Sequence, residues 1–357
     1  METSSLDQVR AAEFGAPGAA ATTYLATAGC GLLPRRAVEA VKALAEENAT
    51  GRRGGAGSSD AVDGARAGFA RLAGVDPGRV ATGGSVAAHV ALVAASLPAG
   101  AEVLAPEGEF SSVVSPFAER GDLKTRYVPL TGLAEAVRPG TALVAFSAVQ
   151  SADGRVADLD AVRAAAAAHG ARTLLDASQS AGWLPLDAGA YDYTVTGAFK
   201  FLMCPRGTSF LTVTEEAQET LPVLYAGRLS AEDRRTSDYG PVRQLASSAR
   251  RFDEPVAFLA YHGAEHSLAV VAGCGTDALY DHATRLAARF REGLAALGHA
   301  AVPGTSAIVA APGLGDREPG LADAGVLVSN RAGSLRAAFH LYNTEADVDR
   351  ALDVLSR

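Results

Sequence analysis

Residues 172–200 read RTLLDASQSAGWLPLDAGAYDYTVTGAFK and contain two strand-like runs, each followed by a polar side chain. The first run, 172–175, ends at Asp176, and the second, 191–195, leads to Lys200. Helix-period and strand-like stretches alternate through the first two thirds of the chain, which is typical of a mostly parallel sheet with crossover helices. Because parallel strands end at one edge of such a sheet, the two polar side chains are expected to lie near each other.

A carboxylate and an amine placed in this way suit one organic cofactor, pyridoxal 5′-phosphate. The Lys200 amine would form a Schiff base with the cofactor aldehyde, and the Asp176 carboxylate would keep the pyridine nitrogen protonated, so that the ring acts as an electron sink. Apolar neighbours flank the lysine, Phe199 before it and 201–203 after it, so burial and a lowered amine pKa are expected. The alternative, usual for an isolated lysine, is a solvated surface position. We predict that Lys200 and Asp176 are the catalytic side chains.

Further residues near strand ends are candidates for the rest of the cofactor site. Gly84 and Ser85 open a predicted helix, 86–97, whose first N–H groups and dipole would favour a phosphate. As an isolated match, this pattern is more often an ordinary strand-to-helix turn. Phe110 follows a strand and a turn and could stack on the pyridine ring, although a buried core phenylalanine is about as common there. Three polar residues complete the predicted cofactor-binding set: Ser178, Gln179 and Thr196.

Residues 334–344 read SLRAAFHLYNT and form the second informative segment. Arg336 stands in a strand-like alternation, and Thr344 is expected to cap the helix that follows. A planar guanidinium can grip a carboxylate through two hydrogen bonds, which suits an α-amino acid substrate. The alternative is a structural ion pair with an acidic neighbour such as Asp347 or Asp349.

The composition of the chain excludes several functional classes. With 357 residues, 48% of them hydrophobic, the chain can form one large domain and a smaller one. We place the boundary near Pro255, giving domains 1–254 and 255–357, with about the first 20 residues packing on the smaller one. A net charge of −8 and scattered arginines argue against nucleic acid. No apolar run reaches membrane-spanning length, and the polar N-terminus does not resemble a secretory signal. Three cysteines show no metal-ligand spacing, so no metal is expected, and a reducing cytoplasm suits them best.

Together these motifs resemble the class V aminotransferase and cysteine desulfurase-like family of fold-type I pyridoxal-phosphate enzymes. The resemblance runs over nearly the whole chain, from Tyr24 to Asp349. It implies an α/β fold whose large domain holds a mostly parallel, seven-stranded-type sheet, with a smaller C-terminal α+β domain. It also implies a homodimer with active sites at the subunit interface. The most specific parts of the resemblance are 176–179, Lys200 with 205–208, and Arg336 with 342–344.

The resemblance also implies a role for each candidate by its position. Lys200 is the Schiff-base lysine, Asp176 pairs with the pyridine nitrogen, Gln179 contacts the ring oxygen, and Phe110 stacks on the ring. The implied phosphate contacts are Gly84 and Ser85, and the implied substrate-carboxylate contacts are Arg336, Ala28 and Gly29.

Three departures from the family pattern bear on function. Gly197 stands where the desulfurase branch often has serine, and Phe199 stands where the family commonly has a polar residue that touches phosphate. Two phosphate contacts are therefore missing unless other groups compensate. Segment 310–336 contains no cysteine, so the sulfur-accepting loop of desulfurases has no counterpart. Phe110 also replaces the desulfurase histidine. We therefore expect no persulfide-forming cysteine desulfurase, and the kynureninase-like, epimerase-like and C–S lyase branches are favoured.

The expected function is that of an enzyme acting at Cα or Cβ of an amino acid, of the aminotransferase or C–S lyase type. An intermediate of secondary metabolism is a plausible substrate. Epimerase-like and kynureninase-like reactions are alternatives, because proton removal at Cα leads to several outcomes and bond orientation decides between them. A catalytically inactive binding or scaffold homologue is a different class, motivated by Gly197 and Phe199. Retention of Asp176, Lys200 and Arg336 argues against it.

Overall fold

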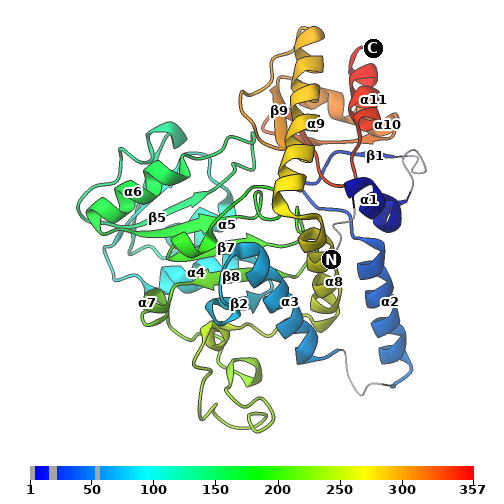
Figure 1. The fold of residues 1–357 in the computed structure, drawn as a ribbon. Coiled ribbons are helices and arrows are strands. Elements are labelled where there is room, and N and C mark those ends of the chain that lie inside the picture. Colours follow the sequence, from blue (N-terminus) through cyan, green and yellow to red (C-terminus); the bar gives the residue numbers. More distant parts are fainter. Residues whose placement is uncertain (1–4, 16–21, 53–56) are drawn as a thin grey trace.

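A seven-stranded sheet forms the centre of the larger part of the protein (Figure 1). The computed structural model describes residues 5–15, 22–52 and 57–357. Within them the strand order is β2-β8-β7-β6-β5-β3-β4, and β8 runs antiparallel to its neighbours β2 and β7, whereas the other pairs are parallel. The predicted mostly parallel seven-stranded sheet is confirmed. The strands are β2 (Val80–Gly83), β3 (Glu102–Pro106), β4 (Lys124–Val128), β5 (Thr141–Ser147), β6 (Arg172–Asp176), β7 (Tyr193–Gly197) and β8 (Ser209–Val213).

Helices cover both faces of this sheet, because its strands carry apolar side chains on both. In β6, Leu174 packs with Val90 of α4, whereas Leu175, one residue on, packs with Val162 of α6. Successive side chains of a strand point to opposite faces, so α4 and α5 cover one face and α6 the other. Helices α3 and α8 cover the rest of that second face. The helices of the larger part are α2 (Arg35–Ala49), α3 (Ser59–Ala73), α4 (Val86–Ser96), α5 (Ser111–Ala118), α6 (Leu159–His169), α7 (Glu215–Gln218) and α8 (Phe258–Cys274).

The C-terminal part holds a second, smaller sheet with three antiparallel strands in the order β11-β12-β9. Helix α9 leads from the larger part to this sheet, and α11 lies beside it (Figure 1). A separate pair of strands, β1 and β10, joins an N-terminal segment to the C-terminal part. The predicted smaller α+β unit is therefore present. The elements concerned are β1 (Thr23–Tyr24), α9 (Thr276–Ala296), β9 (Ile308–Pro312), α10 (Glu318–Asp323), β10 (Val326–Leu327), β11 (Ser329–Arg331), β12 (Ser334–Ala338) and α11 (Glu345–Leu355).

The N-terminal helix α1 (Leu6–Phe14) contacts the C-terminal segment. Its Arg10 Nε donates to the carbonyl oxygen of Leu341 at 2.8 Å, and the Phe14 ring meets Tyr342 edge-on at 5.2 Å between centroids. The other residues expected to pack on the smaller domain, 1–4 and 16–20, lie outside the described part of the chain. The domain boundary between residues 254 and 255 stays a prediction, and α8, which follows it, packs on α2 and α3. Among the described residues, no helix combines the length and apolar character needed to span a bilayer.

Candidate active site

Strands β6 and β7 bring Asp176 and Lys200 into one buried site. Asp176 ends β6 and is 4% exposed, and Lys200 stands in the turn after β7 and is 7% exposed. The backbone N–H of Ser178 donates to Asp176 Oδ1 at 2.8 Å, which fixes the carboxylate. The turn leaves no room for a side chain at Gly31, because a Cβ there would lie 2.1 Å from the Lys200 carbonyl oxygen. The chain has three lysines, and the other two, Lys42 and Lys124, are exposed.

Burial dominates the electrostatics of this pair. Burial lowers the pKa of Lys200, the negative charge of Asp176 opposes that shift, and the cations Arg336, Arg206 and Arg331 add to it. Burial also raises the pKa of Asp176, against the positive charge of the lysine and the hydrogen bond from Ser178. A neutral amine is the form that attacks a carbonyl carbon, so the lowered pKa of Lys200 favours its predicted role.

Phe110 borders the lysine and is not a core residue. Its side chain is 42% exposed, and its ring centroid lies 5.1 Å from Lys200 Nζ. The Phe199 ring lies 6.0 Å from the same atom. The alternative of a buried core phenylalanine at position 110 is therefore wrong. The open face of its ring beside the amine suits stacking on a planar ligand.

Glu109, which sequence reasoning missed, fixes this edge of the sheet. Its buried carboxylate accepts from Ser147 N at 2.8 Å, Ser147 Oγ at 2.6 Å and Gln150 Nε2 at 2.8 Å. It also accepts from the backbone N–H of Phe110 at 2.7 Å, so it ties the end of β3 to the end of β5. The sequence feature that could have indicated Glu109 is its place directly before Phe110, in the turn after a predicted strand.

Arg336 presents two unpaired donors inside the protein. The side chain lies on β12 and is 1% exposed. Its Nη1 donates to the Ser151 carbonyl oxygen and, at 3.1 Å, to Ser151 Oγ. Nε and Nη2 have no partner among the described residues. These two nitrogens lie on one edge of the planar guanidinium, which is the edge that grips a carboxylate bidentately. Desolvation lowers the pKa of Arg336 to about 10, and the charge of Arg331 adds to that shift.

The predicted alternative for Arg336, an ion pair with a nearby acid, is wrong. Asp349 is bound to Arg289 at 2.7 Å, and Asp347 accepts from the backbone N–H of Thr344 at 2.8 Å. The second contact also confirms that Thr344 begins helix α11 as its cap.

Gln179 joins the Ala28–Gly29 turn to the arginine. Its Nε2 donates to the carbonyl oxygen of Ala28 at 2.9 Å and to Ser151 Oγ at 3.0 Å, and its Oε1 has no partner in the described chain. A Cβ placed on Gly29 would lie 3.9 Å from Arg336 Nη2. The residues predicted to surround a substrate carboxylate are therefore neighbours. Ser151, which links them, carried no signal in the sequence.

The loop between β2 and α4 already binds an anion. Ser85 is the N-cap of α4, and its Oγ accepts from Ala88 N at 3.2 Å. The backbone N–H of Gly84 donates to Oε2 of Glu254 at 2.9 Å. The backbone N–H that was predicted to hold phosphate therefore donates to a carboxylate. That carboxylate belongs to a residue far away in the sequence. Beside this loop, Ser178 Oγ accepts from the backbone N–H of Gly197 at 2.8 Å.

Thr196 lies apart from these residues. Val195 pairs with Asp176 across β6 and β7, so the next side chain in β7 leaves on the opposite face of the sheet. There Thr196 lines a cavity of about 240 Å³ with Phe69 and Leu72 of α3. Its Oγ1 is buried and has no partner among the described residues.

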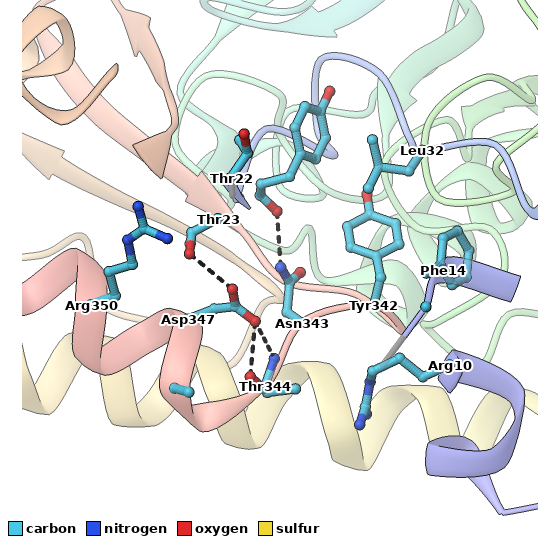
Figure 2. A pocket seen from close by; sticks show the side chains of 13 residues that line it. Arg10, Phe14, Thr22, Thr23, Leu32, Tyr342, Asn343, Thr344, Asp347 and Arg350 are labelled. Carbon is cyan, nitrogen blue, oxygen red and sulfur yellow. Dashed lines mark hydrogen bonds between the residues drawn. The ribbon is translucent and has the colours of Figure 1, made fainter. Parts of the chain in front are cut away.

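A separate cavity of about 180 Å³ lies between α1, β1 and the start of α11 (Figure 2). The Asn343 Nδ2 donates to the Tyr24 carbonyl oxygen at 2.9 Å. Thr23 Oγ1 donates to Asp347 at 3.0 Å, as Figure 2 shows. None of the predicted site residues lines it. Among the described residues, no group of three or more His, Cys, Asp or Glu side chains could hold a metal ion.

The buried site fits pyridoxal 5′-phosphate on three observations. An amine of lowered pKa stands beside an exposed aromatic face. A buried carboxylate lies close enough to interact electrostatically with that amine. The amide at the start of α4 binds an anionic oxygen. In this arrangement Lys200 would hold the aldehyde, Asp176 the pyridine nitrogen, and Gly84 with Ser85 the phosphate.

Comparisons with known proteins bear on the family and on the fold of the chain. The family model described as Aminotransferase class-V matches residues 23–312. The uncharacterized aminotransferase YcbU of Bacillus subtilis is 26% identical over 319 residues, covering 82% of each chain. Isopenicillin N epimerase of Streptomyces clavuligerus is 29% identical over 338 residues, covering 82% of this chain and 83% of that protein. A solved complex of the cystine C–S lyase C-DES with its product cysteine persulfide has a TM-score of 0.84 at 24% identity, covering 95% of this chain and 98% of that one. That last likeness shows a shared fold.

Proposed function

The chain belongs to the aminotransferase class-V family, and from this premise we propose that it is an enzyme acting at Cα or Cβ of an amino-acid substrate, of the aminotransferase or C–S lyase type. Its cofactor is pyridoxal 5′-phosphate, as the sequence predicted. The reaction type and the roles of single residues are part of the proposal.

The free edge of Arg336 is the observation that supports an amino-acid substrate most strongly. Two donors of this buried cation have no partner in the described part of the chain, which is energetically costly unless a ligand accepts from them. The Ala28–Gly29 turn borders that edge, and Lys200 is near enough for the arginine charge to lower its pKa. A carboxylate held there would place its neighbouring amino carbon towards the lysine.

The chain's own residues divide the work as follows. Bound pyridoxal phosphate supplies an electron sink for the bond that breaks at Cα. Lys200, whose pKa burial lowers, takes a proton from Cα and can return it. Asp176 would hold a proton at the pyridine nitrogen, and the exposed ring of Phe110 would be available to stack on the pyridine. Arg336 fixes the carboxylate and so decides which bond at Cα is aligned for cleavage.

The relatives support the choice between reactions only at a coarse level. One curated relative is called an aminotransferase and another an epimerase, and one solved neighbour is a C–S lyase. We favour transamination or C–S lysis over persulfide-forming desulfuration, because 310–336 has no cysteine to receive sulfur. Burial raises the pKa of Cys204 out of the thiolate range and that of Cys274 to about 11, and Cys30 is only partly exposed.

We also propose that two copies of the chain form the working enzyme, in a reducing cytoplasm. Gly84, Ser85 and Phe110 line the proposed site and are exposed to solvent in the single chain. A closed site would exclude water, and a second subunit can provide the cover. All three cysteines are free, which suits a reducing compartment. A catalytically inactive scaffold would have no need for a buried lysine beside Asp176, or for a buried arginine with two donors that lack partners among the described residues.

Half-reaction spectroscopy separates the candidate reactions. The cofactor-loaded protein is mixed with single amino acids and cysteine conjugates, and its visible absorption and products are followed. Accumulation of pyridoxamine phosphate indicates transamination, and release of pyruvate and ammonia indicates elimination. Inversion of the Cα stereocentre without either product would favour the epimerase alternative. The proposal fails if cofactor-loaded protein changes no amino acid in the panel while retaining its bound cofactor.

A further inference from the structure

We propose that the Glu254 carboxylate is an internal occupant of the amide site at the start of α4 and competes there with the cofactor phosphate. The inference rests on the proposed function, because it concerns the phosphate end of the proposed cofactor site. It adds a residue that limits the affinity for the cofactor and sets the preference between its phosphorylated and unphosphorylated forms.

The contact between Glu254 and the loop is direct, and the carboxylate lies beside two glycines. Gly84 N donates to Glu254 Oε2 at 2.9 Å. A Cβ on Gly83 would lie 3.0 Å from Glu254 Cδ, and a Cβ on Gly84 would lie 3.5 Å from Oε2. The first separation is tighter than ordinary van der Waals contact, so the carboxylate lies against bare backbone. A phosphate oxygen bound by the same N–H would have to take the place of Oε2, because one N–H directs only one such bond.

Glu254 is held at this position by its backbone. Its own N–H donates to the Thr82 carbonyl oxygen at 3.0 Å. The preceding residue, Asp253, forms a buried two-point ion pair with Arg66, at 3.0 and 2.6 Å, and accepts from the Thr82 N–H at 2.9 Å. This segment is therefore fastened to β2, and only the Glu254 side chain is free to leave the loop.

The carboxylate is incompletely satisfied where it stands. Its Oε1 is buried and has no hydrogen-bond partner among the described residues. Burial raises its pKa, and the hydrogen bond from Gly84 opposes that shift. A phosphate group can use this amide, further N–H groups of the first turn of α4 and the Ser85 hydroxyl. A phosphate can therefore displace the Glu254 carboxylate. The displaced carboxylate stays only a few ångströms away, however, and its negative charge repels the bound phosphate.

The test measures affinity rather than activity. Apo-protein is titrated with pyridoxal 5′-phosphate and, separately, with unphosphorylated pyridoxal, and binding is followed by cofactor absorption. Glu254→Gln keeps the side-chain shape and the acceptor for Gly84 but removes the charge. Since two charges about 4 Å apart repel appreciably even in water, the variant should bind pyridoxal phosphate about tenfold more tightly. Its affinity for pyridoxal should stay within about twofold of wild type, because that ligand carries no phosphate charge.

Glu318→Gln is the matched control, since this half-buried glutamate lies in α10 of the smaller part. It should leave both affinities unchanged. The inference is wrong if Glu254→Gln binds pyridoxal phosphate no more tightly than wild type, or if it changes both ligands equally. Glu254→Ala applies the same test should the glutamine variant not fold. If wild type and variants all fail to bind pyridoxal phosphate, the proposed function fails as well; if all bind it equally, only this inference fails.

Discussion

Replacing Arg336 by methionine removes the two donors that we assign to the substrate carboxylate and keeps an unbranched side chain of similar length. Among the described residues, Nε and Nη2 have no acceptor, whereas Nη1 donates to Ser151. Removing a buried charge with unpartnered donors stabilises the fold, whereas losing the hydrogen bonds of Nη1 destabilises it. The two effects oppose each other, so the free energy of unfolding should change by no more than about 1 kcal/mol. Urea unfolding of the variant and of the wild type measures this change in the free energy of unfolding.

The effect on binding should be much larger. Truncating one partner of a buried, hydrogen-bonded charge pair costs about 2–5 kcal/mol. This range corresponds to a loss of affinity of about 30-fold to 4000-fold. The assay titrates cofactor-loaded protein with the best amino acid of the panel and with the matching amine, which lacks the carboxylate. Only the amino acid should lose affinity, because the amine has nothing for Arg336 to bind.

Arg289→Met is the control, since this exposed arginine pairs with Asp349 on the neighbouring helix. It should affect neither ligand. The reasoning is refuted if Arg336→Met weakens amino acid and amine equally, or if the amino acid loses less than about fivefold in affinity. Either result would mean that the guanidinium does not hold the substrate carboxylate.

Three further predictions concern stability and the placement of the site. Asp253→Asn breaks the buried ion pair with Arg66 and should lower the free energy of unfolding by about 3–5 kcal/mol. Asp349→Asn, at an exposed ion pair, should lower it by at most about 1 kcal/mol. Equal losses of the two variants in urea unfolding would contradict this prediction. Burial lowers the pKa of His89 to about 4, so the folded state keeps it neutral while the unfolded chain binds a proton below about pH 6.5. Stability should therefore fall between pH 6.5 and 4, and replacing His89 by asparagine should flatten that fall in denaturant titrations; an unchanged slope would speak against it. Thr196→Val removes an unpaired hydroxyl on the far face of the sheet and should leave the affinity for pyridoxal phosphate unchanged, which a loss of more than about fivefold would disprove.

The fold could be predicted well because its main strands are compact apolar runs at regular spacing. The helix Glu345–Leu355 begins directly after its expected cap, Thr344, and β6 ends at the expected Asp176. Strand β4, Lys124–Val128, was missed because it lies at the sheet edge, where polar side chains replace the apolar pattern. Helix Ser111–Ala118 was missed as well, since it is short and contains Pro116.

Functional residues that directly follow a strand could be predicted from the sequence. Contacts made by residues far away in the sequence could not. The structure places Asp176, Lys200 and Phe110 together, as the order of strands suggested. The acceptor for the Gly84 amide comes from a residue 170 positions away, which no local pattern could indicate. Thr196 was chosen for its polarity, but the alternation of β7 turns it to the other face of the sheet.

Covalent attachment of the cofactor tests the central claim most directly. The chain offers only Lys42, Lys124 and Lys200 as lysine amines, so the attachment point can be identified by reducing the loaded protein with borohydride and mapping the peptides by mass spectrometry. We expect the reduced pyridoxyl phosphate group on Lys200 alone, and no visible cofactor band in Lys200→Ala. A group found on one of the two exposed lysines, or a band that survives Lys200→Ala unchanged, would contradict the account.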